Sequence, residues 1–275
     1  MNALCVPAPA KVNLFLHVTG RRADGYHELE SLMALVDLCD SLALLRRDDA
    51  QIVRDCEVEG VAVDEDLCLR AARVLQAAAN VRAGVSISLA KRIPMGAGLG
   101  GGSSDAASVL LALNRLWNLD WPRAKLQEVA ATLGADVPFF VGGGNALARG
   151  IGEALTPVTL PTAYLVLVQP RAHVRTADIF AARELTRDAP SAKIDVFSEG
   201  YGRNDLAAVT AARFAPVAQA LAELPGARMT GSGSCVFATF ASEQAAIDAR
   251  SRLPAPSDAR LVRTLARHPL AGFAR

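Results

Sequence analysis

The sequence predicts an α+β fold, and two features of its pattern support this class. Strand-like and helix-like segments mix in both halves of the 275-residue chain. Hairpin-like links occur beside crossover-like links, which indicates α+β rather than a doubly wound parallel sheet. A chain of this length suits one large domain or two modest ones, and residues 156–161 (TPVTLP) form the most linker-like segment near its middle.

The first half begins with a strand at 10–19, where apolar and polar residues alternate. A turn-rich loop at 20–31 (GRRADGYHELES) follows it and contains Tyr26 and His27. Further along, we expect strands at 34–46, 51–54 and 84–92, and helices at 67–80, at 105–117 and from about 120 to 134.

The second half is expected to begin with a buried strand at 163–168 (AYLVLV). The segment ARMTGSGSCVFATF predicts a strand, a glycine turn and a second strand. Helices are expected at 175–185, 204–212, 214–224 and 242–252, and a last strand at 259–266.

The composition is typical of a folded protein with a small-molecule partner. Hydrophobic residues make up 51% of the chain, and 29 Lys and Arg balance 28 Asp and Glu. A net charge of +1 lacks the basic surface that attracts nucleic acids or anionic membranes, so we expect neither as a partner. No apolar run reaches the roughly 20 residues that span a bilayer. The first residues also lack a signal-peptide pattern, so we expect a cytoplasmic protein.

Five cysteines, without a CxxC pair or a nearby histidine, argue against a zinc ribbon or a disulfide framework. Buried free thiols are the favoured interpretation. No carboxylates are spaced as a preformed metal site, so we expect none built from the protein's own side chains.

A glycine-rich segment at 94–107 (PMGAGLGGGSSDAA) separates a predicted strand from a predicted helix. Glycine allows a positive φ and a close approach of a ligand to the backbone. The N-terminus of the following helix adds partial positive charge. This segment therefore predicts an anion site of the kind that holds a polyphosphate.

Other interpretations of this segment are weaker. Gly96, Gly98 and Gly101 satisfy GxGxxG, but a dinucleotide fold needs a parallel strand after the helix, and here a second helix follows. A Walker A loop needs a lysine where Ser103 stands. A glycine turn that binds nothing is also open, although so many glycines carry an entropic penalty without a packing reason.

Three segments of the chain resemble the GHMP kinase superfamily, whose members phosphorylate hydroxyl groups of small metabolites with ATP. They are PMGAGLGGGSSDAA, the N-terminal PAPAKVNLFL, and MTGSGSCVF at 229–237. The loop RADGYH and the segment LGADVPFF are similar to one branch of this superfamily, which acts on a cytidine diphosphate-linked methylerythritol. The resemblance runs from about residue 7 to about residue 240.

This resemblance implies the fold and the reaction. Residues 1–155 would form an N-terminal domain of the ribosomal-protein-S5-like domain 2 type, and residues 156–275 a ferredoxin-like C-terminal domain. The reaction would phosphorylate the 2-hydroxyl of the methylerythritol in non-mevalonate isoprenoid precursor synthesis, with ATP as co-substrate and Mg²⁺ on its phosphates. We expect a monomer or a weak homodimer.

Three residues match positions at the reaction centre of the superfamily. Asp136 would accept the proton of the substrate hydroxyl, and Lys11 would orient Asp136 and stabilise phosphoryl charge. Asn13, on the same strand face as Lys11, would hydrogen-bond the methylerythritol hydroxyls. From the residue pattern alone, Asp136 could be a helix N-cap and Lys11 a solvated side chain.

The cytidine would be recognised by residues from two distant segments. Tyr26 would stack on the cytosine, His27 would hydrogen-bond its edge, and Phe180 would cover the opposite face of the ring, with Thr176 nearby. Phe180 could instead be a core residue of an amphipathic helix.

The ATP site would be built from the glycine loop and its neighbours. Lys91, Met95 and Leu67 match the superfamily's adenine pocket, whereas Asp66 replaces an asparagine that is frequent there. Ser104 is a candidate contact for Mg²⁺. The residues expected to bind ATP are Leu67, Lys91, Pro94, Met95, Gly96, Ala97, Gly98, Leu99, Gly100, Gly101, Gly102, Ser103 and Ser104.

Two other functions stay open. A superfamily kinase for a different small alcohol would not need the pair Tyr26 and His27. A nucleotide-binding regulator without chemistry would not need Lys11 and Asp136 together, because only a hydroxyl acceptor requires a proton acceptor.

Overall fold

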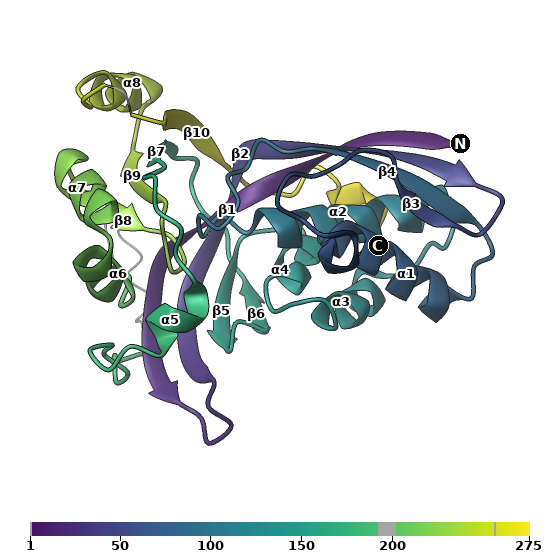
Figure 1. Cartoon of the computed structure of the whole chain (residues 1–275), viewed down its shortest axis with the longest axis horizontal. Helices are drawn as coiled ribbons and strands as arrows, with labels where there is room; N and C mark the ends of the chain where they lie inside the picture. The colour runs from purple at the N-terminus through teal and green to yellow at the C-terminus, as the bar shows by residue number, and fades with distance from the viewer. Residues whose placement is uncertain (1, 192–201, 256) are drawn as a thin grey trace.

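Ten strands form one mixed sheet in the computed structural model, which describes residues 2–191, 202–255 and 257–275. Along the sheet the strands follow the order β3-β4-β2-β10-β7-β9-β8, while β1 and β5 also pair with β2, and β6 pairs with β5. Helices α1 to α4 lie under the part of the sheet that contains β1, β2 and β4 (Figure 1). The α+β class is confirmed.

Two long antiparallel strands form the spine of the molecule. They are β1 (Ala3–Arg21) and β2 (His27–Arg47), and they pair from one end to the other. The predicted loop at 20–31 is shorter than expected, since β2 already begins at His27. A tight turn makes this possible, in which the Gly25 N–H donates to the Arg22 carbonyl at 3.1 Å.

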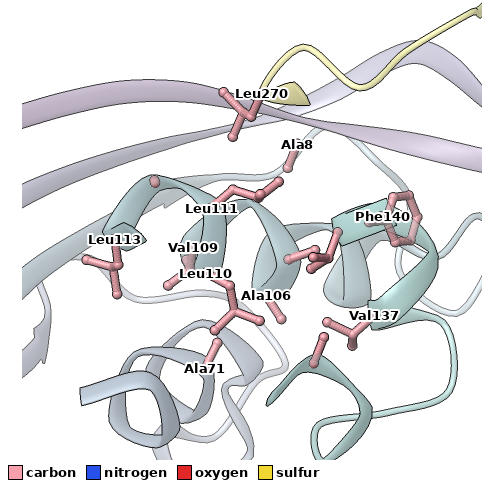
Figure 2. Packing of buried hydrophobic residues seen from close by; sticks show 14 of the residues in the cluster. Ala8, Ala71, Ala106, Val109, Leu110, Leu111, Leu113, Val137, Phe140 and Leu270 are labelled. Carbon is pink, nitrogen blue, oxygen red and sulfur yellow. The ribbon is translucent and has the colours of Figure 1, made fainter. Parts of the chain in front are cut away.

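The helices of the first half pack around one central helix. This helix, α2 (Gly101–Leu116), is buried along nearly its whole length. Leu110 lies over Ala71 of α1 (Leu67–Ala79), and Leu111 lies on the side of Ala8 of β1 (Figure 2). Each buried leucine stabilises the fold by roughly 1.5–3 kcal/mol. The remaining elements here are β3 (Ile52–Arg54), β4 (Gly84–Ala90), α3 (Arg123–Ala131) and α4 (Val137–Gly142).

Several elements in this half differ from the prediction, and β1 and β2 are both longer than expected. Helix α2 begins at Gly101 rather than at residue 105, because its own packing overrides the low helix propensity of two glycines. Helix α4 was not expected, since it has only six residues. The segment at 156–161 is not wholly a linker, because β5 (Ala146–Gly150) pairs with β6 (Ala154–Pro157).

The second half follows the predicted order, with a shorter first helix. Its elements are β7 (Tyr164–Val168), α5 (Thr176–Phe180), α6 (Ala207–Arg213), α7 (Ala215–Glu223), β8 (Arg228–Met229), β9 (Val236–Phe240), α8 (Glu243–Ser251) and β10 (Ala259–Leu265). Strand β10 pairs with both β7 and β2, and this joins the sheets of the two halves.

The last ten residues return to the first half of the chain. Leu270 is buried in the core around α2 (Figure 2). The Asn114 side chain donates to the Phe273 carbonyl at 2.9 Å, and the Arg123 guanidinium donates to the Ala274 carbonyl at 3.1 Å. None of the helices in the described ranges combines the length and the apolar character that a membrane span requires.

Candidate active site

The glycine loop connects β4 to α2 and is shaped by three left-handed residues. Gly96, Gly98 and Gly100 have φ of 67°, 76° and 70°. At Gly98 a Cβ atom would lie 2.2 Å from the Thr230 carbonyl oxygen, so only glycine lets the two backbones meet. Gly100 is the N-cap of α2 and has no side chain to cap it. The first N–H groups of the helix are therefore left for an anion.

The loop forms one wall of a cavity of about 370 Å³. Leu67, Lys91 and Met95, which were expected in an adenine pocket, lie in its wall. The apolar residues Val58 and Val61 of the preceding segment also line it, and so do Glu65, Asp66, Cys68, Leu89 and Asp105. The other expected ATP residues that line it are Pro94, Gly96, Ala97, Gly98, Leu99, Gly100, Gly101, Gly102 and Ser103.

Ser104 is the exception among the expected ATP residues. Its side chain is fully buried, and its hydroxyl donates to the Pro9 carbonyl at 2.6 Å. It therefore fixes α2 against β1 and does not line the cavity, and the Mg²⁺ contact expected of it stays a prediction. Sequence spacing could not separate it from its neighbour Ser103, which does line the cavity.

Lys91 is held by two buried carboxylates at the edge of this cavity. Its ammonium group contacts Asp40 and lies 2.7 Å from Asp105. Burial raises the pKa of Asp105 to about 7, although the charge of Lys91 opposes this. Asp66 is also fully engaged, since it accepts from the Cys68 N–H at 2.8 Å and from Arg54 at 3.0 Å.

A second cavity, of about 200 Å³, lies on the other side of the glycine loop. Gly98 and Gly100 line both cavities, so the loop is their common wall. The expected residues Lys11, Asn13, Asp136, Thr176 and Phe180 all line this second cavity. It brings together residues from β1, from the N-terminus of α4 and from α5.

Lys11 and Asp136 form an ion pair inside this cavity, with 3.5 Å between Nζ and Oδ2. The Lys11 side chain is 5% exposed, so it is not the solvated lysine that the residue pattern would favour. Asp136 stands at the N-cap of α4 but makes no capping hydrogen bond, and its side chain is 35% exposed. Its carboxylate is therefore open to a ligand in the cavity.

Asn13 ties the cavity floor to the C-terminal glycine motif. Its Oδ1 accepts from Lys11 Nζ at 2.7 Å and from the Gly231 N–H at 3.0 Å, and its Nδ2 donates to Ser31 at 2.7 Å. The Asn13 N–H donates to the Thr230 hydroxyl, which in turn donates to the Gly98 carbonyl at 3.1 Å. Thr230 and Ser31 were not predicted, although the glycine motif around Thr230 signalled a close backbone contact.

Of the residues expected to bind cytosine, Phe180 and Thr176 line the second cavity, whereas Tyr26 and His27 do not. The rings of His27 and Phe180 stack with centroids 5.0 Å apart and an interplanar angle of 32°. A base between two rings needs roughly 7 Å, twice a carbon contact distance, so none fits between these two. Tyr26 is 62% exposed. Thr176 shares a 2.7 Å hydrogen bond with Ser232.

The described ranges hold few clustered metal-ligating side chains. No group of three or more His, Cys, Asp or Glu side chains there could hold a metal ion. Within the wall of the second cavity Asp136 is the carboxylate.

Each half of the chain matches the model of a known protein family. Residues 66–144 match the family model of the GHMP kinases N terminal domain, and residues 188–259 match that of the GHMP kinases C terminal domain. The two matches cover more than half of the chain, including the glycine loop and Asp136.

Relatives with similar sequences extend over the whole chain. The 4-diphosphocytidyl-2-C-methyl-D-erythritol kinase of Cupriavidus taiwanensis is 54% identical over 277 residues, with 98% of this chain and 95% of that protein covered. The enzyme of the same name from Thiobacillus denitrificans is 55% identical over 270 residues, with 97% of each covered.

Solved structures agree with this relationship. A crystal structure of 4-(cytidine 5'-diphospho)-2C-methyl-D-erythritol kinase superposes with a TM-score of 0.84 at 37% identity, covering 95% of this chain and 99% of that one. The homoserine kinase of Cytophaga hutchinsonii superposes with a TM-score of 0.67 at 16% identity, over 98% and 96% of the chains, which shows a shared fold alone.

Proposed function

Because this chain belongs to the GHMP kinase family, we propose that it transfers the γ-phosphoryl group of ATP to the 2-hydroxyl of 4-diphosphocytidyl-2-C-methyl-D-erythritol. This reaction makes it an enzyme of isoprenoid precursor synthesis. The observation that carries the proposal is the glycine loop as a shared wall, with the Lys11–Asp136 pair in one of its two cavities.

ATP binds in the larger cavity, with its phosphates along the glycine loop. The adenine ring lies among Leu67, Met95 and Lys91. The N-terminus of α2 points its open N–H groups at the phosphates, where the helix dipole favours negative charge. Gly98 and Gly100 bring the γ-phosphate to the boundary with the second cavity, because they line both.

The acceptor alcohol binds in the second cavity and reacts across the loop. Its 2-hydroxyl oxygen attacks the γ-phosphorus, the bond to the bridging oxygen of ADP breaks, and the hydroxyl proton passes to Asp136. Lys11 orients this carboxylate at 3.5 Å and offsets the charge that develops on the phosphoryl oxygens. Asn13 orients the methylerythritol hydroxyls beside Lys11.

Asp136 and Ser103, each of which lines one of the two cavities beside the loop, would face a Mg²⁺ ion carried by ATP. Such an ion would offset negative charge on the phosphates. The cytidine lies beside Phe180, which lines the second cavity, with Tyr26 and Phe180 as stacking partners and His27 at the base edge.

The test is ADP release by the purified protein with ATP, Mg²⁺ and 4-diphosphocytidyl-2-C-methyl-D-erythritol. In Asp136→Asn, kcat should fall by about 10²- to 10⁴-fold, the usual contribution of a positioned proton acceptor, while ATP binding persists. The matched control is Asp120→Asn, at an exposed position outside both cavities that asparagine also tolerates.

Two outcomes would contradict the proposal. Wild-type protein that binds ATP but releases no ADP with this alcohol would remove the substrate assignment. Full activity of Asp136→Asn would show that Asp136 is not the proton acceptor, whatever the substrate.

A further inference from the structure

Arg187 contacts His27, the histidine expected to bind the cytosine edge. Its Nε donates to His27 Nε2 at 3.1 Å. One Nη donates to the Leu185 carbonyl at 2.9 Å, and the other donates to the carbonyls of Phe180, at 3.1 Å, and of Ala182. A single half-buried guanidinium thus fixes an imidazole ring, the end of α5 and the segment that follows it.

These contacts determine which nitrogen of His27 carries the proton. An arginine has donors and no acceptor, so the His27 Nε2 that it meets must accept. In a neutral imidazole the hydrogen then belongs to Nδ1. Burial, together with the positive charges of Arg187 and Arg21, lowers the pKa of His27 below its ordinary value of 6.5, so the ring is neutral at pH 7.

Two contacts leave few positions on the His27 ring where a ligand can bind. Phe180 covers one of its faces, with ring centroids 5.0 Å apart. Arg187 occupies the Nε2 edge. The Nδ1–H group is therefore the polar group that His27 offers to a ligand, and it is a donor.

We propose that Arg187 is the positioning residue for pyrimidine selection, because it holds His27 as a hydrogen-bond donor that suits the acceptor edge of cytosine. This inference rests on the proposed function and deepens it. The N3 atom of cytosine accepts a hydrogen bond, whereas N3 of uracil carries a hydrogen and would meet the His27 donor head-on. Arg187 acts through His27 and does not itself touch the base.

The experiment compares Arg187→Leu and Arg187→Lys with the wild type. The readouts are kcat/KM for the cytidine substrate and for its uridine counterpart, together with long-range ¹H–¹⁵N spectra of the four histidines. In Arg187→Leu, kcat/KM for the cytidine substrate should fall at least tenfold, mostly through KM, and the preference for cytosine should fall at least tenfold. The KM for ATP should stay unchanged, and Arg187→Lys should recover part of the loss.

The matched control is Arg183→Leu, at an exposed position in the same segment, which should leave both substrates unaffected. The spectra should show His27 of the wild type protonated on Nδ1, and Arg187→Leu should shift it toward a mixture of tautomers. A wild-type His27 protonated on Nε2, or an unchanged cytosine preference in folded Arg187→Leu, would overturn the proposal.

Binding of CDP and UDP to the wild type separates this inference from the proposed function. If no ADP is released with the methylerythritol substrate but CDP perturbs His27 more than UDP does, the reaction assignment fails and the role of Arg187 stands. If CDP leaves the His27 signals unchanged, the role of Arg187 falls. If Arg187→Leu does not fold, the His27 tautomer of the wild type and the CDP titration still test the proposed role of Arg187.

Discussion

At the scale of single residues, Lys91 faces more negative charge than it can neutralise. It contacts Asp40 and Asp105, whose side chains are 0% and 3% exposed. Asp40 is also anchored by the N–H groups of Arg92 and Ile93, so it accepts three hydrogen bonds. Asp105 has an oxygen, Oδ1, that is buried without a hydrogen-bond partner. Burial favours the protonation of one of these two carboxylates, and Asp105 is the one that takes the proton because it has fewer hydrogen bonds.

This arrangement predicts a pH dependence of stability. The pKa of Asp105 is about 7 in the folded protein and 3.8 ordinarily, so the folded state binds more protons between these values. The stability that Asp105 contributes is complete below about pH 4 and is lost as pH rises through 7. We expect Asp105→Asn, which does not titrate, to gain stability relative to wild type as pH rises from 5 to 8, in urea unfolding.

Asp37→Asn is a suitable control, since Asp37 pairs with Arg263 at the surface. If the wild type and Asp105→Asn lose or gain stability in parallel between pH 5 and 8, the titration does not belong to Asp105.

At the scale of elements, two glycine-rich turns lock against each other. Gly98 of the first turn and Gly231 of the second have positive φ, and a Cβ on Gly231 would lie 3.0 Å from the Gly98 Cα. The Thr230 hydroxyl bridges Asn13 and Gly98, so β1, the glycine loop and the turn between β8 and β9 share one junction. The junction fixes the loop between the two cavities.

We predict that Gly98→Ala disrupts this junction. A methyl group there would lie 2.2 Å from the Thr230 carbonyl, and the left-handed backbone itself disfavours alanine by about 1–2 kcal/mol. The variant should be less stable by at least about 2 kcal/mol, since the backbone must also shift. Thermal unfolding and ATP titration measure the two effects.

Gly102→Ala provides the comparison within the same loop. Gly102 lies in the first turn of α2, and its new methyl group would only touch Leu67 at 3.5 Å. The unfolding temperature of Gly102→Ala should equal or slightly exceed that of the wild type, because alanine has a higher helix propensity than glycine. Equal losses of stability in the two variants would argue against a special contact at Gly98.

At the scale of the whole molecule, the C-terminal tail binds the two halves together. After β10, which pairs with β2, the His268 N–H donates to the Gly143 carbonyl at 3.0 Å, and His268 Nδ1 accepts from the Leu270 N–H at 3.1 Å. His268 is 2% exposed. Burial, and to a smaller degree Arg123, lowers its pKa to about 4.

His268 should therefore make the fold sensitive to acid. Its folded pKa lies below its ordinary value of 6.5, so its contribution is present above pH 6.5 and is lost as pH falls toward 4. From pH 7.5 to 5.0, the wild type should lose up to about 2 kcal/mol more than His268→Asn, which keeps an acceptor for the Leu270 N–H. Urea unfolding at the two pH values tests this, and equal losses would contradict it.

Part of the candidate site could be predicted from local sequence signals. The glycine loop, the strand before it and the helix after it were predicted, because glycine content and residue periodicity are local signals. The family resemblance located Lys11 and Asp136, and the structure brings them within 3.5 Å. The domain boundary after residue 155 stays a prediction.

The sequence by itself determined the α+β class, the order of most elements and the phosphate-binding loop. Only the tertiary structure decided that Ser104 packs against β1, that Thr230 holds Gly98, and that Arg187 fixes His27. The physical reason is distance along the chain. Arg187 and His27 are 160 positions apart, and Thr230 and Asn13 are 217 apart. Periodicity and capping describe neighbours in sequence, whereas these hydrogen bonds exist only once the sheet has brought the two halves together.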